Sequence, residues 1–144
     1  MKYPVTTEVT VYFSDCDPMG HCNNARFFTF MEQARVEYLK KVPDLNLTVS
    51  SRRMPDFILA EASCTFKSPA YLDEKIVVQI RISEIRTRSF LMEYEMRERK
   101  TKRLIAVARS AQVMFHYKTH KTFPIPLELR RAVDKIERRK FPKP

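Results

Sequence analysis

Apolar and polar residues alternate in five stretches of this chain, a pattern typical of β-strands that expose one face to water. The stretches are residues 5–13, 57–67, 75–85, 90–99 and 104–117. Within 75–85 and 90–99 the even-numbered positions 76–82 and 90–96 are apolar, whereas the odd-numbered positions are largely polar. Successive side chains of a strand point to opposite faces of a sheet. We therefore expect a sheet with one buried face and one solvated face.

Between the first and second stretches the apolar positions follow the period of an α-helix. From about residue 24 to residue 41 they form a wide apolar surface, and Pro43 ends the helix. A second, short helix is expected at about 127–139, after Pro124 and Pro126. Residues 48–55 are predicted to form a loop between the long helix and the second strand.

The order of these elements predicts an α+β fold in a single domain that spans residues 1–144. The connections among the last four strands are too short for crossover helices, so we expect antiparallel pairing. A helix with so much apolar surface has to be covered by the sheet. The sheet leaves open edges, and residues 104–117 are apolar on both faces. We therefore expect a homo-oligomer rather than a monomer.

The net charge of the chain indicates that its partners are anionic. The formal net charge is +10, which attracts anions such as nucleic acid, an acidic carrier protein or a phosphate-bearing cofactor. Residues 127–144 form a basic run with seven lysines and arginines against three acids. This run lacks interleaved aromatic residues that stack on bases, which disfavours nucleic acid. No stretch approaches the ~20 apolar residues of a membrane span, and the N-terminus lacks the apolar run of a secretory signal. We expect a cytoplasmic protein with no membrane association.

The cysteines and histidines argue against a metal site. The chain has three cysteines, an odd number without CxxC spacing, which disfavours both a disulfide framework and a zinc site. They are Cys16, Cys22 and Cys64, and we expect reduced thiols. The three histidines are too scattered to form a metal site. No bound metal is predicted.

The only glycine of the chain, Gly20, lies between the first strand and the long helix. It is part of the run Ser14-Asp15-Cys16-Asp17-Pro18-Met19-Gly20-His21-Cys22-Asn23-Asn24. Glycine suits a turn that needs positive φ or a close approach to the backbone. The run fits a reacting carboxylate held at a helix start, and it equally fits a plain turn with Asx caps.

This run and the order of elements resemble the hotdog-fold acyl-thioesterases, in particular the group related to 4-hydroxybenzoyl-CoA thioesterase. Members carry a D-x-D-x-x-G-H-x-N-N loop, then a helix that begins with aromatic residues and carries a Glu-x-Ala-Arg segment. Here the segment is Glu32-Gln33-Ala34-Arg35. A weaker match is the run Phe66-Lys67-Ser68-Pro69-Ala70-Tyr71-Leu72-Asp73. The resemblance covers nearly the whole chain.

The resemblance implies a five-stranded antiparallel sheet wrapped around one long central helix, with a short C-terminal helix. It implies an acyl-CoA thioesterase that releases a free acid and CoA and needs no cofactor, because CoA is part of the substrate. It also implies a homodimer or a dimer of dimers with the substrate channel between subunits. The alternatives are hydrolysis of acyl groups on acyl carrier protein, and a non-catalytic acyl-binding protein.

The resemblance also assigns roles to residues. Asp17 is the catalytic carboxylate, either as nucleophile or as the base that activates water, and Asp15 is structural. Asn24 falls where some relatives have His or Tyr, and we expect it to position water or the carbonyl group. His21 is a further candidate in the catalytic set, for which a hydrogen bond that fixes the loop is the simpler interpretation.

The expected substrate-binding residues surround the start of the helix. Free N–H groups at a helix start suit the oxyanion of a tetrahedral intermediate. We expect these amides near Asn23 and Asn24. Gly20 allows the loop to approach the substrate, and Phe27 and Phe28 line the acyl pocket. Glu61 is left out of the catalytic set, since it fits a solvent-facing strand position.

Overall fold

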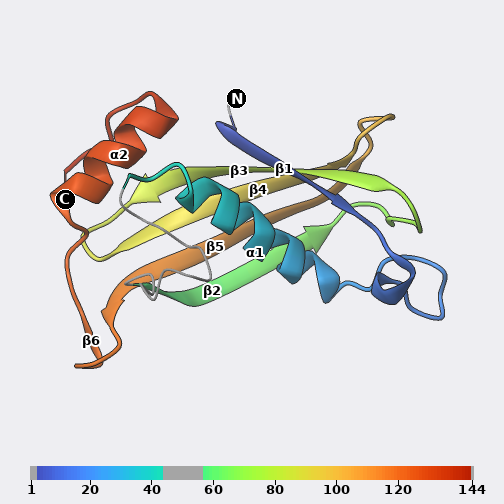
Figure 1. Cartoon of the computed structure of the whole chain (residues 1–144), viewed down its shortest axis with the longest axis horizontal. Helices are drawn as coiled ribbons and strands as arrows, with labels where there is room; N and C mark the ends of the chain where they lie inside the picture. Colours follow the sequence, from blue (N-terminus) through green and yellow to red (C-terminus); the bar gives the residue numbers. More distant parts are fainter. Residues whose placement is uncertain (1–2, 44–56, 144) are drawn as a thin grey trace.

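The computed structural model describes residues 3–43 and 57–143, so the loop expected at 48–55 lies outside the described residues. A single antiparallel sheet packs against helix α1 (Arg26–Leu39), which runs across one face of it (Figure 1). Helix α2 (Leu127–Glu137) lies beside strand β3 at one end of the sheet (Figure 1). The expected α+β hotdog arrangement is confirmed.

All neighbouring strands of the sheet are antiparallel, as expected, but their order is not the order of the sequence. Across the sheet they are β1 (Val5–Thr10), β3 (Lys75–Ile85), β4 (Ser89–Glu98), β5 (Leu104–His116) and β2 (Phe57–Phe66). A short strand that the pattern did not predict, β6 (Lys121–Thr122), pairs with the end of β5. Strand β2 therefore pairs with β5 rather than with β3, the next strand along the chain.

The alternation in β3 and β4 divides the two faces of the sheet as predicted. The inner face is buried and contributes Ile76, Val78, Ile80, Ile82, Phe90, Met92, Tyr94 and Met96. The outer face carries partly exposed polar residues, among them the ion pair of Arg81 with Glu93. Helix α1 lies over the inner face and buries Phe27, Phe30, Met31, Ala34, Tyr38 and Leu39.

Three elements are shorter than the pattern predicted by two residues or more. Strand β1 ends at Thr10, and a turn of 3₁₀-helix, η1 (Phe13–Asp15), follows, so that Phe13 is exposed instead of continuing the buried face. Helix α1 has 14 residues and starts at Arg26, because Asn24 and Ala25 form a turn before it, closed by the Arg26 N–H donating to the Asn23 carbonyl. Helix α2 ends at Glu137, because Arg138 takes a left-handed conformation with φ of 56°.

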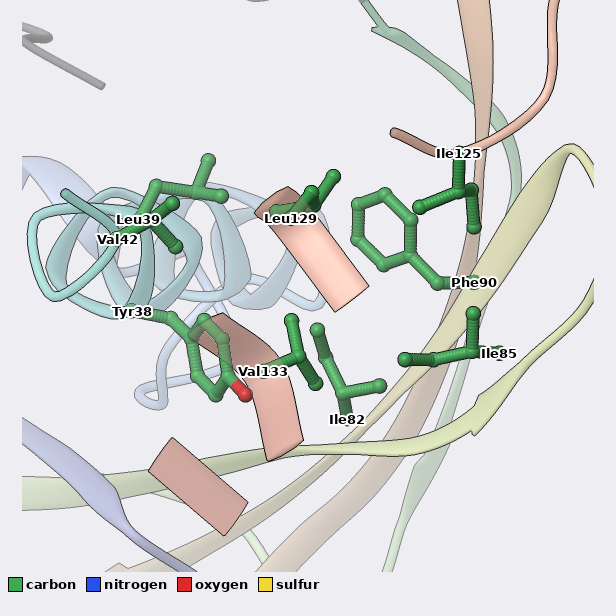
Figure 2. A pocket seen from close by; sticks show the side chains of 9 residues that line it. All are labelled: Tyr38, Leu39, Val42, Ile82, Ile85, Phe90, Ile125, Leu129 and Val133. Carbon is green, nitrogen blue, oxygen red and sulfur yellow. The ribbon is translucent and has the colours of Figure 1, made fainter. Parts of the chain in front are cut away.

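An apolar seam joins helix α2 to the end of α1 and to the sheet. Figure 2 shows the side chains that meet there, which come from α1 and its C-terminal turn, β3, β4, the segment before α2, and α2 itself. They are Tyr38, Leu39, Val42, Ile82, Ile85, Phe90, Ile125, Leu129 and Val133. The void between them is about 10 Å³, near the lower limit for a single water molecule. The seam is therefore part of the packed core.

One carboxylate fixes this seam. Glu137 Oε2 accepts a hydrogen bond from the Tyr38 hydroxyl at 2.6 Å and another from the Ile82 N–H at 2.8 Å. The pairing of β1 with β3 starts at Ile80, so the Ile82 amide lies beyond the end of β1. The carboxylate thus supplies the acceptor that β1 does not. Burial raises the pKa of Glu137, and it also raises the pKa of Tyr38.

We predict that Tyr38→Phe destabilises the protein by about 1–2 kcal/mol, because the buried carboxylate loses one of its two donors. Urea unfolding at neutral pH, followed by circular dichroism at matched protein concentration, measures this change. Glu137→Gln is the matched variant, since the amide oxygen still accepts both hydrogen bonds. An equal loss in both variants would contradict a specific role for the Tyr38 hydroxyl.

We also predict that the stability difference between the wild type and Glu137→Gln depends on pH. Because the pKa of Glu137 is raised on folding, its contribution to stability is fully present below its unfolded pKa and is lost as the pH rises through its folded pKa. The wild type should therefore lose unfolding free energy relative to Glu137→Gln as the pH rises from about 4.3. Unfolding curves at several pH values test this. A difference that stays constant or grows in favour of the wild type would contradict the prediction.

Candidate active site

The loop between β1 and α1 contains a short antiparallel pair of its own. Cys16 and Cys22 form an isolated β-bridge. On either side of this bridge the Asn23 N–H donates to the Asp15 carbonyl at 2.8 Å, and the Asp17 N–H donates to the His21 carbonyl at 3.1 Å. The loop is therefore a small hairpin, and its tip carries Gly20.

The tip is where the only glycine is needed. Gly20 has φ of +90° and donates its N–H to the Asp17 carbonyl at 3.0 Å. A Cβ built on Gly20 would meet nothing within 4 Å. The constraint is therefore the positive φ rather than a lack of space, because side chains of L-residues disfavour that conformation.

The two aspartates of the loop differ in their contacts. The Asp15 carboxylate accepts the Tyr12 N–H at 2.9 Å and forms an ion pair with Arg26 at 3.3 Å. Both of its oxygens are thus engaged in holding the loop to its flanking segments. The Asp17 carboxylate accepts only the Met19 N–H, at 2.9 Å through Oδ1. Its Oδ2 has no hydrogen-bond partner within residues 3–43 and 57–143.

Asp17 lines an open pocket of about 530 Å³, formed by the loop, the first turn of α1 and the end of β2. The Cys22 N–H donates to the Ala70 carbonyl at 2.7 Å and so joins the loop to the segment after β2. The lining residues are Asp17, Met19, His21, Cys22, Asn23, Asn24, Phe27, Phe66, Lys67, Ser68, Pro69 and Ala70. The pocket combines a carboxylate, an imidazole and two carboxamides with an aromatic wall.

The start of α1 leaves one candidate oxyanion donor among the amides of Asn23 and Asn24. The Asn23 side chain accepts the Ala25 N–H at 2.9 Å, while the Asn23 N–H is already used by Asp15. The Asn24 N–H donates to no acceptor in the part of the chain that the structure describes. The hairpin therefore uses the Asn23 amide, and the Asn24 amide stays the candidate donor near these two residues.

His21 lines the pocket, and its imidazole has no hydrogen-bond partner among the described residues. The hydrogen bond that fixes the loop at this position comes instead from the His21 carbonyl, which accepts the Asp17 N–H. The backbone of His21 thus holds the loop, and its imidazole is not needed for this.

The aromatic wall differs from the one expected. Phe27 is buried and its ring packs edge-on against Phe66, with 5.2 Å between ring centroids. Phe28 is partly exposed and does not line the pocket of this chain. The expected role of Phe28 is therefore not supported here, because the residue after Phe27 turns about 100° around the helix.

Sequence reasoning missed the pocket residues at the end of β2 and just after it, which lie more than 25 residues beyond the end of α1. These residues are Phe66, Lys67, Ser68, Pro69 and Ala70. The Phe-x-x-Pro segment was the available signal, but alternation alone does not reveal that the end of β2 meets the loop. Among the described residues that line the pocket, Lys67 is the one with a positively charged side chain.

Other candidate groups lie away from this pocket. Glu61 is exposed on the outer face of the sheet, where it lines a separate hollow of about 180 Å³ with Arg86 and Arg109. Across residues 3–43 and 57–143, no group of three or more His, Cys, Asp or Glu residues is placed to hold a metal ion. No helix in these ranges is long and apolar enough to cross a membrane.

Comparisons with known proteins agree with this geometry. The model of the thioesterase-like superfamily matches residues 11–133. An acyl-CoA thioesterase of Haemophilus influenzae is 28% identical over 88 residues, which cover 61% of this chain and 65% of that protein. The match thus spans slightly less than two thirds of the length of that relative.

Two solved structures are similar over almost the full chain. A thioesterase from Thermus thermophilus, complexed with coenzyme A and zinc, is 27% identical with a TM-score of 0.83, covering 96% of this chain and 98% of that one. A 1,4-dihydroxy-2-naphthoyl-CoA thioesterase from Synechocystis is 25% identical with a TM-score of 0.79, covering 92% and 97%. With the family model matching most of its length, the chain belongs to the thioesterase-like superfamily.

Proposed function

We propose that this protein hydrolyses acyl-CoA thioesters to a free acid and CoA. The observation that carries the proposal is the Asp17 carboxylate, which lines the pocket with one oxygen unpaired among the described residues. Water is a poor nucleophile at neutral pH, so hydrolysis needs either a base that activates it or a carboxylate that attacks the carbonyl carbon itself. An unpaired carboxylate oxygen is suited to both roles.

The second requirement is a donor for the charge that develops on the thioester oxygen. Asn24 lines the same pocket, and its N–H, just before α1, is not used within the described structure. A backbone amide at a helix start combines a fixed direction with the positive end of the helix dipole. We infer that this amide holds the oxyanion and that the Asn24 side chain positions water or the carbonyl group.

The remaining pocket residues suit the two ends of the substrate. The edge-on pair of Phe27 and Phe66 offers an apolar wall for the acyl group, and Lys67 offers a cation for a phosphate. The similar Thermus thermophilus protein was solved with coenzyme A, which supports CoA as the carrier. The net charge of +10 also suits an acidic acyl carrier protein, and turnover of matched acyl-CoA and acyl-carrier substrates distinguishes the two.

Asp17→Asn should lower kcat by a factor of about 10²–10⁴, because the amide is nearly isosteric but neither attacks a carbonyl nor accepts a proton from water. A panel of aliphatic and aromatic acyl-CoA substrates, followed by release of free thiol, measures the loss. Glu61→Gln makes the same chemical change outside the pocket and should keep wild-type activity. If Asp17→Asn retained more than about a tenth of the wild-type kcat, the proposed role would be wrong.

Gly20→Ala should lower the free energy of unfolding by about 1–2 kcal/mol, because alanine disfavours a φ of +90°. It should also lower kcat/KM, since the same turn holds Asp17. Gly20→Asn is the control, because asparagine tolerates positive φ better and should lose less of both. Kinetics and urea unfolding of the three proteins test this, and an unchanged Gly20→Ala protein would show that the turn is an ordinary one.

We also propose that the protein is a homodimer or a dimer of dimers whose subunits pair along β2. This strand pairs with β5 on one side only in the described structure. Two large apolar side chains of β2, Leu59 and Phe66, are 47% and 44% exposed. An open strand edge with exposed apolar residues favours pairing with another copy. Phe66 also lines the pocket, so a partner at this edge would border the site.

Sedimentation at micromolar concentration should give a dimer or tetramer, and Leu59→Lys should shift it toward monomer with loss of activity, because a buried lysine at the interface is costly. Leu127→Lys makes the same change at an exposed position of α2 and should leave the mass unchanged. A wild-type monomer with full activity would contradict the pairing, as would an undiminished Leu59→Lys oligomer.

A further inference from the structure

Two of the three cysteines face each other across the hairpin that carries Asp17. Cys16 and Cys22 are bridge partners, and the two hydrogen bonds flanking them join their neighbours rather than the cysteines themselves. This is the non-hydrogen-bonded type of antiparallel pair, in which the Cα atoms lie about 4.5 Å apart and the side chains leave the same face. The backbone thus brings the two thiols to one side of the hairpin.

From this geometry we propose that Cys16 and Cys22 form a reversible intramolecular disulfide. A disulfide needs Cα atoms about 4.4–6.8 Å apart, a range that includes the spacing of such a pair. Both side chains pack against the same apolar core. The Cys16 thiol donates to the Tyr12 carbonyl at 3.6 Å and the Cys22 thiol to the Asn23 carbonyl at 3.7 Å, so the bond forms by rotation of the two side chains away from these weak contacts. The ring closed by this disulfide contains Asp17, Gly20 and His21. The proposal does not depend on whether the protein hydrolyses thioesters.

The third cysteine lacks this arrangement. Cys64 lies on β2, where its bridge partner on β5 is Ala108. It is therefore held by the sheet in register with a residue that carries no thiol. The contrast makes Cys64 an internal control, since it is a free thiol of the same chain without an opposing cysteine.

The two thiols of the pair differ in access. Cys22 is only 4% exposed, and burial raises its pKa to about 12. Cys16 is half-buried and closer to solvent. Since the thiolate is the attacking form, we expect Cys16 to react first with an external reagent and Cys22 to react second, within the chain.

The oxidant in this proposal is a low-molecular-weight disulfide. The Cys16 thiolate attacks one sulfur of that disulfide, which breaks its S–S bond, forms a mixed disulfide and releases one small thiol. Cys22 then loses its proton to solvent and attacks the Cys16 sulfur, which releases the second small thiol. In sum, two protein thiols are oxidised and one small disulfide is reduced. An excess of small thiol reverses both steps.

The test uses the purified full chain and glutathione disulfide, with the products trapped by alkylation and identified by mass spectrometry of peptides. We expect the free thiols to fall from three to one, with Cys64 alkylated and Cys16 linked to Cys22. Dithiothreitol should restore all three. Cys64→Ser should lose two thiols in the same way, whereas Cys16→Ser and Cys22→Ser should give no internal disulfide.

A second measurement separates a preformed pair from two merely reactive thiols. At one fixed ratio of glutathione to glutathione disulfide, the folded Cys64→Ser protein should be at least several-fold more oxidised than the same protein in urea, because folding holds the thiols opposite each other. An equal or lower oxidised fraction in the folded state would overturn the proposal. So would three persistent thiols in the wild type, or a disulfide that involves Cys64 or a second chain.

Discussion

The burial of α1 against the inner face of the sheet is the interaction on which the rest of this structure depends. The helix packs several large side chains against that face, and β3 and β4 contribute a row of buried apolar side chains to the contact. At about 25 cal/mol per Å², burial on this scale is the dominant favourable term in folding. Its geometrical consequence is that the first turn of α1 lies at one edge of the packed region, where the pocket opens.

The same burial explains why the two ends of α1 differ in chemistry. At the C-terminal end, Tyr38 closes an apolar seam, and Glu137 satisfies its hydroxyl together with a strand amide. Polar groups there are paired within the protein. At the N-terminal end, the Asn24 amide and one oxygen of Asp17 have no partner in the described part of the chain. Unpaired polar groups in a concave, partly apolar site are what ligand binding requires.

The sequence predicted those features that depend on neighbouring residues. The alternation in β3 and β4 identified their buried faces, and the motif around Gly20 located the pocket. Features set by contacts between distant segments were missed. Nothing local indicates that β2 pairs with β5 rather than β3, and therefore nothing local placed Phe66 and Lys67 beside Asp17. Phe28 was expected in the pocket because it follows Phe27 in the sequence. Successive residues of a helix lie about 100° apart around its axis, and Phe28 does not line the pocket of this chain.

The hairpin between β1 and α1 serves two purposes because its residues alternate. Cys16 packs against the core, whereas Asp15 and Asp17, on either side of it, are directed elsewhere. The Asp15 carboxylate binds the flanking backbone and Arg26. Asp17 is therefore the carboxylate of the loop that keeps an oxygen without a partner in the described part of the chain. Anchoring the hairpin through its apolar positions is thus what presents Asp17 to the pocket. A change at the anchored side, including a bond between Cys16 and Cys22, acts on the backbone that carries Asp17.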